Sequence, residues 1–203
     1  MDASTNCASQ ASCIKGQGME FVIRYYSSNS SNSKNLTKAE AIALSNAGLY
    51  LIAVFQDTNR SASDFSYDKG KAAGKAAYDY AKNTIGQPTG THIFFVVDYD
   101  ASDTDLKGPI LQYFTGAQDA IKAASSSTID YYLGVYGGGT VCDYLYNNVT
   151  YVYRRWLSMS TGFRGSNGYT NWNIKQSVGG SICSIGYDAD ESDNSGMGWK
   201  VTS

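Results

Sequence analysis

Two carboxylates two residues apart follow the most apolar stretch of the chain. Residues 93–97 are all apolar, and Asp98 and Asp100 come directly after them. A short run of β-branched and aromatic residues predicts a strand buried on both faces, as in parallel sheets covered by helices. If strand geometry continues, the two carboxylates point the same way, with Cα atoms about 6.6 Å apart. Sites form at the carboxyl ends of such strands, although Asp98 capping a loop and Asp100 facing solvent is the simpler alternative.

Polar or aromatic residues also end several other predicted strands. If these ends converge on one face of a barrel, three or four carboxylates share a cleft and raise one another's pKa. Glycoside hydrolysis requires a protonated acid beside an ionised one. The alternative is that these are separate Asp residues at the starts of loops, where Asp is common. The residues at the other strand ends are Asp2, Arg24, Tyr25, Gln56, Tyr136, Gln176 and Asp188. Of these, we expect Arg24, Tyr25, Gln56, Tyr136 and Gln176 to bind substrate.

The predicted elements alternate between strand and helix through the first two-thirds of the chain. Strands are expected at residues 2–6, 20–26, 49–55, 93–97, 131–136, 151–159, 171–176 and 181–188. Helices are expected at residues 8–15, 37–47, 66–85, 106–124 and 141–146. This alternation predicts an α/β protein with a parallel sheet. Eight strands in 203 residues predict a compact single-domain (β/α)₈ TIM-like barrel over residues 1–203, with short late helices.

Other reaction classes lack their motifs. No G-x-S-x-G occurs, and His92 begins the central strand at the end opposite Asp98, which argues against Ser or Cys chemistry with a His base. The glycine-rich residues 134–139 lack the order of a phosphate loop. Asp188, Asp190 and Ser192 resemble a calcium loop that lacks its glycine and terminal Glu. We therefore expect neither a metal nor a cofactor.

Composition indicates a globular protein without a charged macromolecular partner. The net charge is -2, hydrophobic residues make up 42% and charged residues 17%, so nothing favours nucleic acid or an anionic membrane. No apolar run approaches the roughly 18 residues of a membrane span. No signal peptide is visible, because residues 2–6 are polar. The 17 Tyr and 3 Trp residues suit carbohydrate binding but equally suit barrel packing. We expect the protein to be a monomer.

Four cysteines leave two interpretations open. None forms a C-x-x-C motif, and the single histidine leaves no Cys/His zinc set. An even number in a chain rich in Ser, Asn and Gly indicates an oxidising compartment, with Cys7–Cys13 closing a local loop and Cys142–Cys183 a long one. Four buried free thiols are the alternative.

Taken in order, the strand ends resemble a known family. They include Arg-Tyr-Tyr at 24–26, Phe-Phe-Val-Val-Asp-Tyr-Asp at 94–100, Gly-Val-Tyr-Gly at 134–137, Trp-Asn-Ile-Lys-Gln at 172–176 and Tyr-Asp-Ala-Asp at 187–190. The chain resembles the glycoside-hydrolase-like TIM-barrel family of exported bacterial and fungal proteins. That family is similar to the family twenty-five muramidases, which cleave peptidoglycan. Residues 96–100 carry the most specific part of the resemblance.

The resemblance implies roles for four acids. Asp100 takes the general-acid position, Asp98 orients the substrate or stabilises the cation, and Asp2 and Asp188 position water and sugar. The muramidases carry Glu where this chain has Asp100, which withdraws the carboxyl group by about 1.5 Å. Misplacement of that order costs roughly 100-fold in rate. Two hypotheses follow: a secreted or envelope-acting glycosidase on peptidoglycan or a related glycan, or a weak or inactive barrel that binds such a glycan. A metal-dependent hydrolase is a third.

Overall fold

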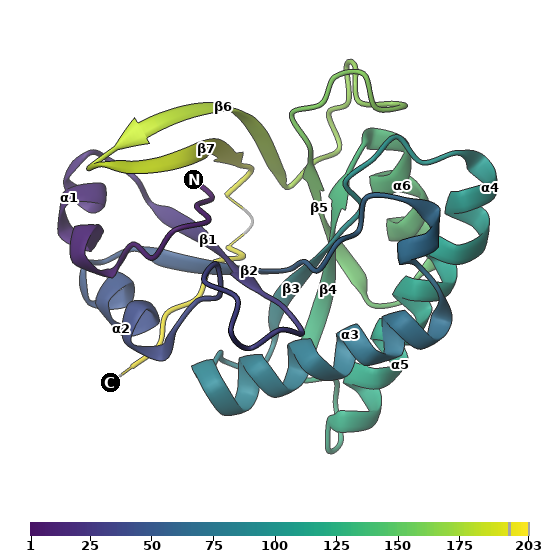
Figure 1. The fold of residues 1–203 in the computed structure, drawn as a ribbon, viewed down its shortest axis with the longest axis horizontal. Coiled ribbons are helices and arrows are strands. Elements are labelled where there is room, and N and C mark those ends of the chain that lie inside the picture. Colours follow the sequence, from purple (N-terminus) through teal and green to yellow (C-terminus); the bar gives the residue numbers. More distant parts are fainter. Residues whose placement is uncertain (195, 203) are drawn as a thin grey trace.

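Seven strands form one curled sheet, a half-barrel, in a computed structural model that describes residues 1–194 and 196–202 (Figure 1). The strands follow one another across the sheet in sequence order, and neighbours are parallel from the first strand to the sixth. They are β1 Phe21–Tyr26, β2 Tyr50–Phe55, β3 Thr91–Val96, β4 Tyr131–Gly137, β5 Val152–Leu157, β6 Ile174–Ile182 and β7 Ile185–Ser192. The predicted α/β class with a parallel sheet is confirmed.

Helices cover the outer face of the first five strands. The α-helices are α1 Ala11–Gly16, α2 Lys38–Asn46, α3 Tyr67–Asp79, α4 Asp103–Asp105, α5 Leu111–Ala124 and α6 Gly139–Asn148. Short 3₁₀ turns occupy Ala8–Gln10 and Ala62–Asp64, and π-helical turns Tyr80–Ile85 and Leu106–Ile110. Thr37 caps α2 through its side chain, which accepts a hydrogen bond from the N–H of Glu40.

The predicted set of eight βα units is wrong at its end. In the described part of the chain no helix follows β5 or β6, and β7 pairs antiparallel with β6. Cys183 and Ser184 both have positive φ, which matches the tight two-residue turn that joins hairpin strands. The strand expected at residues 181–188 therefore straddles this turn. A two-residue turn leaves no room for a crossover helix, so the last pair cannot be parallel.

The start of the chain lies between the two edges of the sheet. Asp2 forms β-bridges to Ile23 of β1 and to Asp188 of β7, and its N–H and C=O exchange hydrogen bonds of 3.0 and 3.1 Å with Asp188. Figure 1 shows the N-terminus between these strands. The short first strand predicted at residues 2–6 is thus reduced to a bridge, which nevertheless links both edges.

Side chains alternate between the interior of the curled sheet and the helix layer. The interior holds a small apolar cluster that includes Ile23, Val54, Phe94 and Trp156. A Cβ on Gly134 would lie 2.4 Å from the Phe94 ring, so the absence of a side chain there lets Phe94 fill the interior. The larger cluster lies outside the sheet, under the helices. A residue's position in the alternation thus decides whether its side chain can reach a site inside the sheet.

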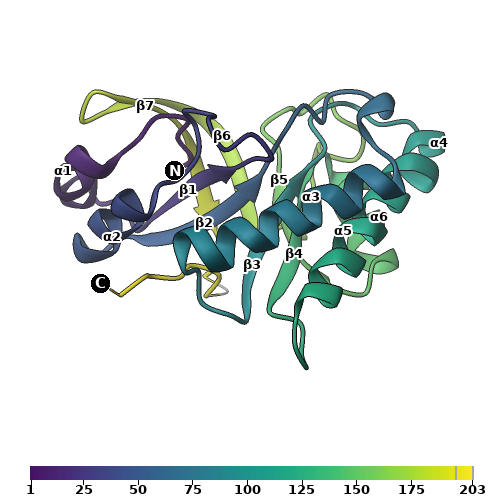
Figure 2. The same cartoon turned by 60° about the horizontal axis from the view of Figure 1, so that its bottom comes forward.

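Two glycines let α3 and α5 pack unusually close together. A Cβ on Gly70 would lie 1.9 Å from the carbonyl oxygen of Tyr113, and one on Gly74 would lie 2.4 Å from that of Ala117. Figure 2 shows the two helices side by side in front of the sheet. Close backbone approach fixes these two helices against each other.

A disulfide joins α1 to the β6–β7 turn, and its pairing differs from the expected one. Cys13 and Cys183 are bonded across 170 residues of sequence, while Cys7 and Cys142 are free and buried. Both expected pairings are wrong, and so is the alternative of four free thiols. The hairpin brings its turn to α1, a contact between chain ends that sequence spacing does not encode.

Replacing both bonded cysteines, as Cys13→Ser with Cys183→Ser, is expected to lower the free energy of unfolding by about 2–4 kcal/mol, because the unfolded chain regains the entropy of a long open loop. Urea unfolding measures the change. Reductant should weaken the wild type by the same amount and leave the double variant unaltered. Recovery of Cys13 on a peptide other than that of Cys183 in a non-reducing digest would contradict this pairing.

Candidate active site

A cleft of about 330 Å³ lies at the carboxyl ends of the parallel strands. Its walls are inward-facing residues that continue the strand alternation, such as Val54 and Val96. Six of the residues predicted from strand ends line it: Tyr25, Gln56, Asp98, Tyr136, Gln176 and Asp188. The structure therefore brings most of the predicted site together, at the position that sites occupy in parallel α/β folds.

Asp98 is the carboxylate that β3 presents to the cleft. Its backbone N–H donates to the Asn59 carbonyl at 2.9 Å, which fixes the chain where the strand ends. Its Oδ2 lies 3.6 Å from Nε of Arg60, and the Asp98 side chain is 31% exposed. Burial raises the pKa of Asp98, and the Arg60 guanidinium offsets this rise only in part. Asp98 thus keeps its proton to a higher pH than an ordinary Asp, as a general acid must.

Asp2 lies behind the cleft wall in a chain of hydrogen bonds. Its two oxygens accept from the Tyr25 hydroxyl and from Nε2 of Gln176, both at 2.9 Å. Oε1 of Gln176 in turn accepts from the Tyr136 hydroxyl at 2.8 Å. Burial raises the pKa of Asp2 although both hydrogen bonds act to lower it, and the nearby Asp188 carboxyl adds to the rise. This chain fixes the side chains of three cleft residues.

Asp100 lies outside the cleft. Asp98 and Asp100 would share a face only if the strand continued through them, but β3 ends at Val96 and the chain bends at Tyr99. Asp100 is exposed, and its Oδ1 accepts a hydrogen bond of 2.8 Å from the backbone N–H of Arg164. It is absent from the residues that line the cleft. In this structure Asp100 anchors the segment that follows β5.

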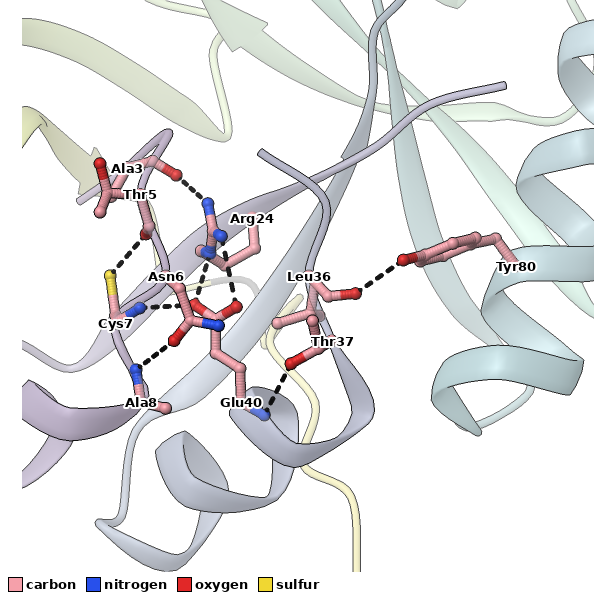
Figure 3. A network of polar contacts seen from close by, with 10 residues as sticks. All are labelled: Ala3, Thr5, Asn6, Cys7, Ala8, Arg24, Leu36, Thr37, Glu40 and Tyr80. Atoms are coloured by element: carbon pink, nitrogen blue, oxygen red, sulfur yellow. Dashed lines mark hydrogen bonds and ion pairs between the residues drawn. The ribbon is translucent and has the colours of Figure 1, made fainter. Parts of the chain in front are cut away.

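Arg24 is also outside the cleft, contrary to the prediction that it binds substrate. It lies between inward-facing Ile23 and Tyr25, so strand alternation turns it toward the helix layer. Figure 3 shows its guanidinium against Glu40 of α2. Nε of Arg24 lies 2.7 Å from Oε1 of Glu40, and both side chains are fully buried. The guanidinium also donates to the Ala3 carbonyl, and Glu40 accepts from the N–H of Cys7 at 2.8 Å. Arg24 therefore has a structural role.

Four side chains of the site region had not been expected there. Lys34, Arg60 and Trp156 line the cleft. Asp190 lies deeper, where its Oδ1 accepts from Nε1 of Trp156 at 2.9 Å, and burial with the nearby Asp2 carboxylate raises its pKa well above the usual range. Because side chains two residues apart on a strand face the same side, Asp190 faces inward with Asp188. Lys34 and Arg60 come from loops, whose course carries no comparable periodicity.

The described residues include neither a cluster of metal ligands nor a membrane-spanning helix. Within 1–194 and 196–202, no cluster of three or more His, Cys, Asp or Glu side chains is placed to hold a metal ion. No helix in the same ranges has the length and apolarity to cross a membrane. His92 lies at the start of β3, beside the ring of Tyr132, and burial lowers its pKa to about 4.

Comparison with known sequences gives a consistent family match. The model of the Rv2525c-like, glycoside hydrolase-like domain matches residues 12–195. The uncharacterized protein YbfG of Bacillus subtilis (strain 168) is 33% identical over 197 residues, which is 90% of this chain and 27% of that protein. The chain thus spans less than a third of the length of the curated relatives it matches.

Solved structures share the fold at low identity. The Tat-secreted protein Rv2525c of Mycobacterium tuberculosis, solved with L-tartrate, has a TM-score of 0.78 at 21% identity, over 97% of this chain and 96% of that chain. The glycosyl hydrolase 25 GHIP of Streptococcus pneumoniae has a TM-score of 0.59 at 10% identity, over 94% and 83%. The lysozyme of Streptomyces coelicolor has a TM-score of 0.55 at 16% identity, over 96% and 91%.

Replacing Arg24 with Met is expected to lower the free energy of unfolding by about 3–5 kcal/mol, because Glu40 is left buried without its partner. Urea denaturation gives the value. The double variant Arg24→Met with Glu40→Met should recover part of the loss, since no charge then remains buried. An Arg24→Met protein of wild-type stability that binds glycan weakly would restore Arg24 to the substrate site.

Proposed function

The chain belongs to the Rv2525c-like, glycoside hydrolase-like domain family, and from this premise we propose that it is a glycosidase acting on a cell-wall glycan. The observation that carries the proposal is the placement of Asp98 and Asp188 on the same cleft, with burial raising the pKa of Asp98. Glycoside hydrolysis needs one carboxyl group that donates a proton and a second that assists water or the sugar cation.

In the proposed reaction Asp98 is the acid. The bond between the anomeric carbon and the glycosidic oxygen breaks, and the oxygen takes the Asp98 proton. Water then adds to the anomeric carbon and gives up a proton to a cleft carboxylate. The Asp188 carboxyl group faces the sugar cation, and Asp2 holds Tyr25 and Gln176 in place through its hydrogen bonds. The resemblance assigned the acid to Asp100, and the geometry favours Asp98 instead.

Two cations support peptidoglycan as the substrate. Lys34 and Arg60 line the cleft, and the Arg60 side chain is 74% exposed beside Asp98. The stem peptides of peptidoglycan carry free carboxylates, which either cation can bind. The lysozyme and glycosyl hydrolase 25 relatives share the fold of this chain.

We place its action outside the cytoplasm. The Cys13–Cys183 disulfide suits an oxidising compartment. The Rv2525c protein of the same fold is described as Tat-secreted, which agrees with this placement.

A glycan-binding barrel without turnover is the second candidate. The position of Asp100 favours it, because only one of the two acids after β3 reaches the cleft. Insoluble peptidoglycan would retain such a protein in a pull-down, and the protein would release no reducing ends from it.

Asp98→Asn is expected to reduce the release of reducing ends from peptidoglycan by at least about 100-fold, because the proton donor is lost. Mass spectrometry of the soluble products measures it, with chitin oligomers as a neutral substrate. Asp100→Asn is the matched control: it changes charge equally and can still accept from Arg164. Wild-type rates for Asp98→Asn with loss of activity in Asp100→Asn would transfer the acid to Asp100. Absence of products from the wild type, with binding retained, would favour the binding barrel.

Arg60→Gln is expected to move the alkaline limb of the pH–rate profile upward by roughly 0.5 pH unit. A protonated acid loses activity as pH rises through its pKa, and removal of the Arg60 cation raises the pKa of Asp98 further. Lys71→Gln, which removes an exposed cation on α3, should leave the limb in place. An unshifted or lowered limb in Arg60→Gln would show that Asp98 is not the titrating acid.

A further inference from the structure

A second cavity adjoins the cleft. It has a volume of about 580 Å³, and Met159 and Gln176 line both cavities. It lies between the loop 158–173 and the start of β6, next to strands that no helix follows within the described residues. The cleft, at about 330 Å³, is at the small end of ligand sites, so a polymeric substrate must extend beyond it.

The walls of the second cavity have the chemistry of a sugar site without that of a catalyst. Trp172 and Tyr169 contribute aromatic rings, and Asn167 and Thr161 contribute neutral hydrogen-bonding groups. Lys175 is the one charged residue of this lining, whereas two acids and two cations line the cleft. Rings that pack on the C–H faces of sugars, beside amides and hydroxyls that bond their edges, suit a neutral carbohydrate.

The loop that forms the cavity is held from several sides. Its Ser166 Oγ accepts from the N–H of Gly139 at 3.1 Å, and the Tyr169 hydroxyl donates to Oδ1 of Asp143 in α6 at 2.6 Å. Nη1 of Arg164 lies 2.7 Å from Oδ1 of Asp103, and the backbone N–H of Arg164 donates to Oδ1 of Asp100. A loop fixed before binding loses little entropy when a ligand arrives, which favours affinity.

We propose that this cavity is a second sugar-binding site, which holds the neutral part of a glycan chain next to the unit in the cleft. This inference rests on the proposed glycosidase activity. Trp172 is the stacking residue of that site, and Asp100 is a positioning residue for its loop through Arg164. The site selects for chain length: a disaccharide occupies the cleft alone, and a longer strand occupies both cavities.

Calorimetry with peptidoglycan glycan-strand fragments tests this, in the Asp98→Asn background so that the fragments stay intact. The hexasaccharide is expected to bind about tenfold more tightly than the disaccharide, and Trp172→Ala should abolish this difference without weakening the disaccharide. Trp172→Phe, which keeps a ring, should retain most of it. Tyr50→Ala, which removes an exposed ring at the start of β2, should retain all of it.

The outcomes separate the two proposals. Equal affinities for the two fragments, or a length preference that survives Trp172→Ala, would overturn the second site and leave the glycosidase standing. Failure of every fragment to bind would overturn both. Circular dichroism of each variant establishes that a lost preference does not reflect a lost fold.

Discussion

The polar network behind the cleft depends on a buried ion pair on the other side of the sheet. Arg24 and Glu40 lie 2.7 Å apart at their closest atoms and are both fully buried. Two buried charges cost several kcal/mol unless hydrogen bonds satisfy their remaining groups, and here the Ala3 carbonyl and the N–H of Cys7 do so. These partners both belong to the first residues of the chain. The pair therefore ties the start of the chain to β1 and α2.

Asp2 connects this anchor to the cleft. Because Ala3 is held from outside the sheet, the preceding Asp2 is held between the edge strands, where it bridges β1 and β7. Its carboxyl group then fixes Tyr25 and Gln176. Asp98 reaches the same cleft from β3, independently of the anchor. The proposed site thus combines a polar network fixed by the start of the chain with an acid fixed by the central strand.

Much of this arrangement could be predicted from the sequence, and the exceptions have physical causes. The apolar runs located the strands, and polar residues at their ends located the cleft, since parallel strands end on one edge. Arg24 was misplaced because β1 is apolar on both faces, which conceals the alternation that separates it from Tyr25. Asp100 was expected beside Asp98 on the assumption that the strand continues, and the bend at Tyr99 ends it.

Features made by loops and by distant chain segments were beyond prediction. The Cys13–Cys183 bond requires the β6–β7 turn to meet α1, which depends on the antiparallel hairpin. Arg60 reaches the cleft from the loop after β2. Trp172, which was expected inside a strand, lies on the loop before β6, and the contacts of Arg164 help to hold this loop. The full set of eight βα units was inferred from the number of predicted strands. Instead, a tight turn joins β6 to β7 as an antiparallel pair.

A titration of the Asp side-chain carboxyl carbons by NMR tests whether Asp98 is the protonated acid of the cleft. Backbone assignment identifies the Asp98 resonance, which is followed with pH. We expect Asp98 to titrate above about 3.9, the ordinary value for Asp, and we expect Arg60→Gln to raise the midpoint further. An Asp98 midpoint at or below the ordinary value would contradict this assignment, because the cleft would then not favour the protonated form of Asp98.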